Sequence, residues 1–210
     1  MGLDITVLVV DRDHLGRTPA AERLGMLENA AYPDDDCDDG VGGADAGVEH
    51  GWVRRPDTPW CALYEFFRTL GSFKPHFWAG QAWEDVLDFA EPDLRATLDV
   101  FLAGLFWLGP DDADTGPEDE PVVGLFPAER DPWHPRLLAV RTPEQVPDLA
   151  RAWAVAAPLL EDLRAPYAVH AESPGRWTAN FEEFAILVRD WGEVVTEASR
   201  SGRGLIGLPI

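Results

Sequence analysis

Positive charge is scarce in this sequence. Its 210 residues include 17 Lys and Arg against 38 Asp and Glu, which gives a formal net charge of −21 at neutral pH. An acidic chain repels the phosphates of nucleic acids and the headgroups of anionic membranes, so we expect neither as a partner. The charge balance instead favours a basic protein partner.

Cysteine is also scarce, and the histidines are not clustered. The two cysteines, Cys37 and Cys61, have no neighbouring histidine, and the five histidines are scattered without the close spacing of a zinc site. No serine stands in the Gly-x-Ser-x-Gly turn that presents a catalytic nucleophile. We therefore predict no metal site and no cofactor, and we favour a non-catalytic protein over an enzyme.

Long apolar runs are missing as well. The longest, "VFLAGLFWLG", has half the length that a membrane-spanning helix needs. The first ten residues, "MGLDITVLVV", lack the basic flank of a signal peptide. We expect a cytoplasmic protein without a membrane span.

Acidic residues are concentrated in two stretches. Residues 34–49 contain seven and residues 111–120 contain six, with no Lys or Arg in either stretch. The first stretch does not fit a calcium-binding loop of the EF-hand type, because with Gly40 at position 6 the ligand positions 3 and 12 fall on Cys37 and Ala46. We interpret residues 33–51 and 110–121, approximately, as flexible acidic surface loops.

Strands are predicted near both ends of the chain and in its second half. Ile5 to Val10 form a continuous apolar, β-branched run, which is typical of a buried strand. The stretches "RLLAVR", residues 136–141, and "GLIGLPI", residues 204–210, have similar patterns.

Helices are predicted from capping residues and apolar spacing. Thr-Pro pairs at residues 18, 58 and 142 suggest three helix starts, and we expect the second helix to run from Pro59 to about Leu70. The third should continue to about residue 163, with Pro158 kinking or ending it. Further helices are expected over residues 92–107 and from Asn180, a capping residue, to Ser199, before Gly202.

These elements predict an α+β fold, in which a small sheet is covered by several amphipathic helices and two acidic surface loops interrupt the chain. We found no internal repeat and no linker between domains. We therefore expect residues 1–210 to form a single domain.

The order of elements from residue 137 to the end carries a resemblance. A strand leads to "RTPEQV" at a helix start, followed by a Tyr-bearing spacer, an acidic and aromatic helix beginning "NFEEF", and a final strand. This third of the chain resembles the C-terminal half of the YfbM-like family of bacterial proteins. The resemblance implies an α+β fold and, since that family has no established activity, no functional residues.

The stretch "VLVVDRDHLG" offers an alternative function. A strand followed by Asp11-x-Asp13 resembles the first motif of haloacid-dehalogenase-like phosphatases, in which one aspartate attacks phosphorus and the other handles the proton. Leu15 stands where that family has Thr or Val, and the alternating strands and helices of a parallel sheet are missing. The alternative hypotheses are a Mg²⁺-dependent phosphohydrolase that uses Asp11 and Asp13, and a polar turn after an edge strand.

Two other segments mix Trp, His and a basic residue among Pro and Gly, as the walls of a binding cleft do. They are "FKPHFWAGQAW", residues 73–83, and "DPWHPRL", residues 131–137. Core packing by the aromatic rings is the alternative. If the segments form a cleft, the binding residues are Lys74, His76, Trp78, Trp83, Trp133 and His134. The leading hypothesis is thus a binding or interaction protein, for example an acidic inhibitor or immunity-type partner of a basic protein.

Overall fold

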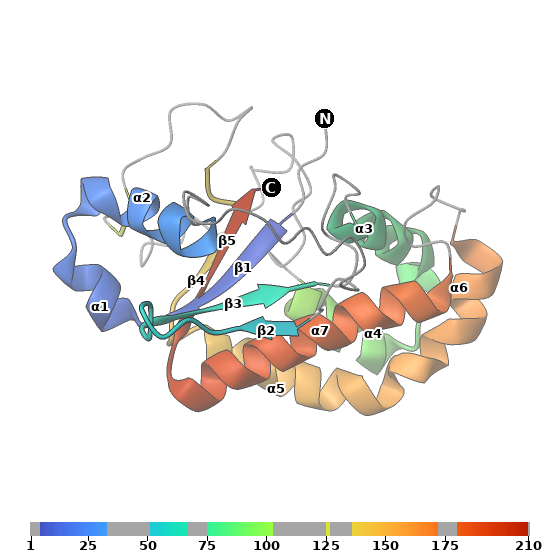
Figure 1. The fold of residues 1–210 in the computed structure, drawn as a ribbon. Helices are drawn as coiled ribbons and strands as arrows, with labels where there is room; N and C mark the ends of the chain where they lie inside the picture. Colours follow the sequence, from blue (N-terminus) through green and yellow to red (C-terminus); the bar gives the residue numbers. More distant parts are fainter. Residues whose placement is uncertain are drawn as a thin grey trace.

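The computed structural model describes residues 5–32, 51–66, 75–102, 125–126, 136–171 and 180–209. Within these residues five strands form one antiparallel sheet in the order β2-β3-β1-β5-β4, and helices cover it (Figure 1). This arrangement confirms the predicted α+β class, with a small sheet and several amphipathic helices. Both predicted acidic loops fall almost entirely outside the described residues, apart from Gly51, which begins a strand.

The strands are β1 (Ile5–Val10), β2 (Gly51–Val53), β3 (Cys61–Glu65), β4 (Ala139–Arg141) and β5 (Gly204–Pro209). Strand β1 lies at the centre of the sheet, with Val7 opposite Tyr64 of β3 on one side and opposite Gly207 of β5 on the other. The interpretation of β1 as an edge strand is therefore wrong. All six residues of β1 are buried because both faces of the sheet are covered.

The α-helices are α1 (Arg12–Arg17), α2 (Ala20–Ala31), α3 (Pro75–Val86), α4 (Pro92–Leu102), α5 (Val146–Ala156), α6 (Arg164–His170) and α7 (Phe181–Ser201). Two 3₁₀ helices, η1 (Leu87–Phe89) and η3 (Ala157–Leu163), continue α3 and α5. The predicted change at Pro158 is confirmed, since the α-helix ends two residues earlier and a 3₁₀ helix follows.

Helix α7 follows the predicted pattern closely. The Asn180 side chain accepts a hydrogen bond from the Glu183 amide at 2.9 Å, and Gly202 ends the helix with a φ of 65°. The apolar side chains spaced three and four residues apart are buried: Phe184, Leu187, Val188, Trp191, Val194, Val195 and Ala198. Burial of each large side chain contributes roughly 1.5–3 kcal/mol, so α7 anchors its face of the sheet.

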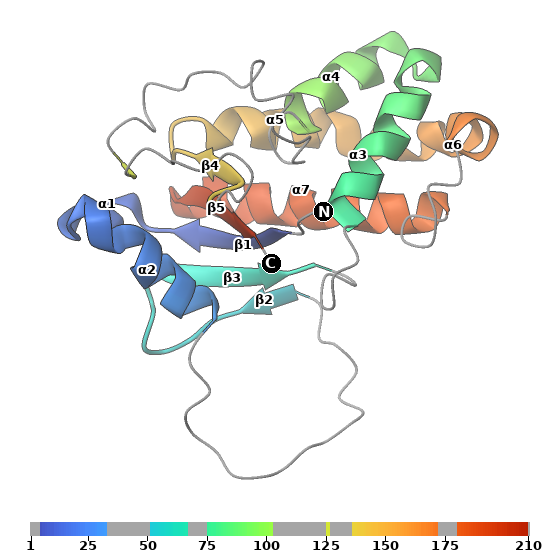
Figure 2. The ribbon, with the colours of Figure 1, turned by 90° about the horizontal axis from the view of Figure 1, so that it is seen from above.

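The helices divide between the two faces of the sheet. One face carries α1 and α2, which bury Leu15, Leu24 and Leu27 against Leu8 and other residues of the sheet. On the other face, α7 packs against β1 and β5, and α5 and α4 stack behind it. Figures 1 and 2 show α1 and α2 at the opposite end of the molecule from α3 and α6.

The predicted helix from Pro59 to Leu70 is wrong, because Cys61–Glu65 form strand β3. Thr58 belongs to the turn before the strand, where its carbonyl accepts a hydrogen bond from the Cys61 amide at 3.0 Å. Strand β3 neighbours the central strand and is buried on both faces, with Leu63 on one side and Tyr64 on the other. A strand buried on both faces loses the polar alternation that would distinguish it from a helix.

Candidate functional site

The predicted binding segment 73–83 contains a core helix, α3, in place of the irregular wall of a cleft. His76 and Trp83 are only 3% and 6% exposed, and Trp78 is half-buried. The His76 ring lies edge-on to Phe66 and Trp191, and the Trp83 indole N–H donates to Asp99 at 3.1 Å. These two side chains pack in the interior and do not present a surface to a ligand.

The other predicted binding residues, Lys74, Trp133 and His134, lie outside the described residues. The structure therefore places His76 and Trp83 within one aromatic core but does not show whether the second predicted segment joins them.

Asp11 caps helix α1. Its carboxylate accepts hydrogen bonds from the backbone amides of Asp13 and His14 at 2.9 and 3.1 Å. These hydrogen bonds, the His14 amide first, lower the pKa of Asp11 although burial opposes them. Asp13 itself is exposed. The arrangement is that of a capping residue at the end of a strand in an antiparallel sheet.

In the described part of the chain, no three His, Cys, Asp or Glu side chains are arranged so that they could hold a metal ion. The Cys61 thiol is buried, and this burial raises its pKa to about 12. Such a thiol stays protonated at neutral pH and is a poor nucleophile.

No helix in the described ranges is long and apolar enough to cross a membrane.

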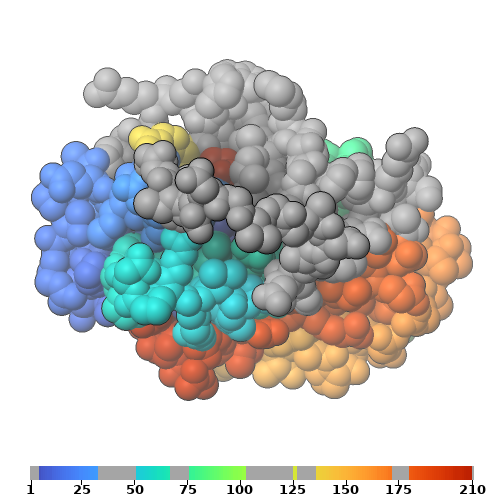
Figure 3. All heavy atoms as spheres, in the orientation of Figure 1, coloured from blue at the N-terminus to red at the C-terminus, as the bar shows by residue number. Residues whose placement is uncertain are grey.

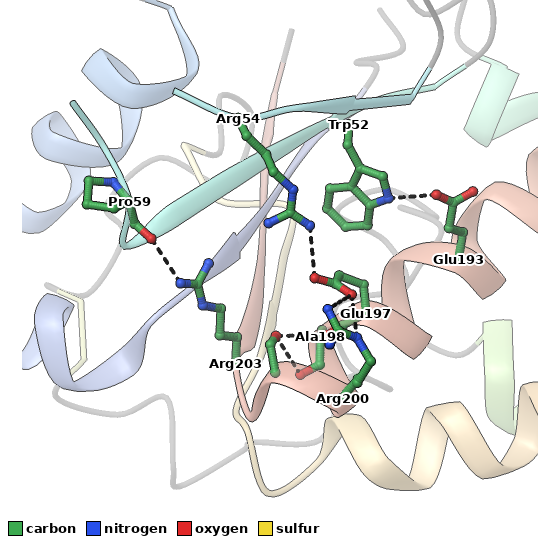
Figure 4. Close-up of polar contacts among 9 residues, drawn as sticks. Trp52, Arg54, Pro59, Glu193, Glu197, Ala198, Arg200 and Arg203 are labelled. Atoms are coloured by element: carbon green, nitrogen blue, oxygen red, sulfur yellow. Dashed lines mark hydrogen bonds and ion pairs between the residues drawn. The ribbon is translucent and has the colours of Figure 1, made fainter. Parts of the chain in front are cut away.

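The edge strand β2 is joined to α7 by a polar network (Figure 4). The Trp52 indole donates to Glu193 at 2.6 Å, and Arg54, which lies 5.2 Å from the centre of the Trp52 ring, pairs with Glu197 at 2.8 Å. Glu197 also pairs with Arg200. Burial opposes ionisation of Glu197, but the hydrogen bonds from Arg200 and Arg54 outweigh it and lower its pKa. These hydrogen bonds and ion pairs give the polar groups partners within the network and hold β2 against α7.

A buried carboxylate lies beside this network. Asp190 of α7 is 5% exposed and accepts a hydrogen bond from the Tyr64 hydroxyl at 3.2 Å. Burial, followed by the charges of Asp190 and Glu193, raises the pKa of Tyr64. Tyr64 is therefore a neutral hydrogen-bond donor at physiological pH.

The surface formed by η1, the start of α4 and the end of α6 combines exposed apolar side chains with acids. Phe89 is 52% exposed and its ring stacks on that of His170. Val169, next to His170, is 73% exposed. We name this region the Phe89 surface. It comprises Phe89, Val169 and His170 together with the surrounding acids Glu84, Asp85, Asp88, Glu91 and Asp93.

The exposed acids of the Phe89 surface differ in whether a described residue neutralises them. Arg95 pairs with Asp88 at 2.6 Å and approaches Asp99 at 3.8 Å. Glu91 and Asp93 are exposed and form no ion pair with any described residue. The surface therefore has apolar area at its centre and unneutralised negative charge around it. Sequence analysis did not predict it, because Phe89 and His170 are 81 positions apart and meet only through the packing of α3 against α6.

Comparison with protein families, curated proteins and solved structures found no match to this chain. The resemblance to the YfbM-like family thus remains a prediction.

Proposed function

We propose that this protein is a non-catalytic binding protein whose partner is a basic protein, in the manner of an acidic inhibitor or an immunity-type protein. The observation that carries the proposal is the excess of acid among the described residues. The described residues include 21 Asp and Glu against 13 Arg and no Lys, a net charge of −8 without either acidic stretch.

The arginines that are present are largely engaged within the fold. Eight of the thirteen described arginines form ion pairs with eight described carboxylates, as Arg164 does with Glu161 and Glu182, and Arg136 with Glu28. The remaining acids produce a negative field that extends from the surface over about 8 Å at physiological ionic strength. Such a field accelerates association with a positively charged partner and disfavours acidic competitors.

The proposal is tested by measuring association with a 15-residue peptide of alternating Arg and Ser, with a peptide of alternating Glu and Ser as the control. We expect saturable binding of the basic peptide only, with an affinity that falls at least about tenfold between roughly 50 and 300 mM salt. Absence of binding by the basic peptide at low salt, or binding that is insensitive to salt, would contradict the proposal.

The same preparation tests the alternative hypothesis that Asp11 and Asp13 form a phosphohydrolase site. Hydrolysis of a generic phosphate ester is measured with and without Mg²⁺. Since the Asp11 carboxylate is engaged by two backbone amides, we expect no hydrolysis above background. A Mg²⁺-dependent activity that Asp11→Asn abolishes would favour the enzyme instead.

A further inference from the structure

We propose that the Phe89 surface is the place where the basic partner docks, and that it takes a segment in which Arg or Lys side chains flank an apolar one. This inference rests on the proposed function and adds the location and the chemistry of the partner. Its starting point is the exposure of Phe89, whose ring stacks on His170, and of Val169, the residue before His170 in the chain.

The apolar centre of the surface is suited to an anchor side chain. The Phe89 ring is held by stacking on His170, so little rotational freedom remains to be lost when a partner covers it. Aromatic side chains of this kind contribute a large share of binding energy when an interface excludes water from them. An apolar side chain of the partner would therefore lie over Phe89 and Val169.

The acids determine which kind of partner covers that centre. Glu84, near the end of α3, and Asp88 of η1 are exposed and precede Phe89 in the chain. Glu91 and Asp93 are exposed and follow it. Arg95 neutralises Asp88, but Glu91 and Asp93 have no such counterion among the described residues. Arginine suits these carboxylates best, because its planar guanidinium can both pair with a carboxylate and stack on an aromatic ring.

Other occupants fit this surface less well. A second copy of the chain would bring the same acids and the same net charge of −21 against it. A nucleic acid would bring phosphates to Glu91 and Asp93. Charge complementarity thus selects a basic protein segment.

The test compares two 15-residue peptides, one with Arg and Leu at the spacing of an amphipathic helix and one in which Ser replaces every Leu. We expect the Leu-containing peptide to bind wild-type protein roughly tenfold more tightly, which is the difference that an apolar anchor of modest size contributes. Phe89→Ser should abolish that difference between the two peptides, with a smaller loss for the Ser-containing peptide, whose Arg side chains still meet the acids. Tyr32→Ser is the matched control, because Tyr32 is 42% exposed and is the residue that follows α2, a helix at the opposite end of the molecule from α3 and α6.

The acids are tested separately by a double charge reversal, Glu91→Lys with Asp93→Lys. We expect binding of both peptides to weaken roughly tenfold, while a reversal at the other end of the molecule, Asp13→Lys with Glu22→Lys, which also removes two exposed acids outside any ion pair between described residues, should have a several-fold smaller effect. Thermal unfolding of each variant establishes that the fold is retained.

The possible outcomes distinguish a failure of the proposed docking site from a failure of the proposed function. Equal losses from the two double reversals, with no effect of Phe89→Ser, would show that net charge alone attracts basic peptides, which overturns the docking site and leaves the proposed function standing. Failure of wild-type protein to bind either peptide overturns both. Loss of the preference for Leu with Tyr32→Ser, but not with Phe89→Ser, would place the site at the opposite end of the molecule.

Discussion

One face of the sheet is covered by α1 and α2 and holds a cluster of mainly aliphatic side chains, whereas the other is covered by α7 and holds a core rich in aromatic rings around the buried Asp190. In the space-filling view of Figure 3, α1 and α2 (blue) lie at one end of the molecule, and α7 (orange-red to red) runs along its lower side toward the opposite end. Aliphatic clusters tolerate exchange of one apolar side chain for another, but flat rings and buried hydrogen bonds require a particular geometry. The α7 face should therefore define the fold more strictly than the α2 face.

Truncation of a core side chain should produce the largest difference in stability between the α7 face and the α2 face. Trp191→Ala removes a side chain that is 1% exposed and contacts Phe66 and His76, and should lower the free energy of unfolding by about 3–5 kcal/mol. Leu27→Ala on the α2 face should cost about 2–3 kcal/mol, because fewer atoms are lost. Urea titration of both variants measures the two values. Equal decreases in the free energy of unfolding would show that the two faces contribute equally to stability.

Glycine substitution sharpens the comparison, since each face has a helical glycine. A Cβ on Gly192 of α7 would lie 2.0 Å from the Trp153 ring, so Gly192→Ala should destabilise the protein by about 1–3 kcal/mol. A Cβ on Gly25 of α2 meets nothing within 4 Å, and Gly25→Ala should instead stabilise by about 0.5–1 kcal/mol. Thermal melts of the two variants should shift in opposite directions, and shifts of the same sign would contradict this account.

Removal of one buried hydroxyl is expected to have a smaller effect. Tyr64→Phe deprives the buried Asp190 of a hydrogen bond and should cost about 1–2 kcal/mol. The control is Tyr32→Phe, which removes an exposed hydroxyl bonded to the Pro209 carbonyl at 3.3 Å and should cost less than about 0.5 kcal/mol. Chemical denaturation distinguishes them, and a neutral Tyr64→Phe variant would show that Asp190 does not depend on this hydroxyl.

The smallest effect should come from the cap of α1 and should depend on pH. The pKa of Asp11 is lower in the folded protein than in the unfolded chain, so its contribution is present above the unfolded pKa and is lost as pH falls through the folded pKa. Asp11→Ala should therefore cost about 1 kcal/mol at neutral pH and progressively less in acid. Parallel stability measurements at about pH 7 and about pH 3 test this, and a cost that does not decline in acid would assign Asp11 another role.

Local patterns predicted the elements whose signals are complete within the sequence. Helix α7 has a capping side chain, an apolar stripe and a terminal glycine, and each of them acts over only a few residues. Strand β1 and strand β5 were predicted from short apolar runs. In these segments the residues that determine the local structure are also those that pack.

Prediction failed where packing decides between two conformations. The apolar run of β3 fits helical spacing, and its pairing with β1 and β2 makes it a strand. The aromatic residues of α3 suggested a cleft, but His76 and Trp83 pack against Phe66, Trp191 and other core residues. The Phe89 surface could not be predicted, because whether Phe89 is exposed depends on how α3 and α6 pack.

The pairing of β1 with β5 has a consequence for how the protein is made. Ile5 lies opposite Pro209, and the central strand therefore gains one of its two neighbours only after more than 200 residues have left the ribosome. Until then one edge of β1 lacks its native strand partner and is open to pairing with another chain, although β3 is already available on its other side. Closing contacts so distant in sequence is slow, so the rate of assembly should depend on the arrival of β5 more than on the early formation of any helix.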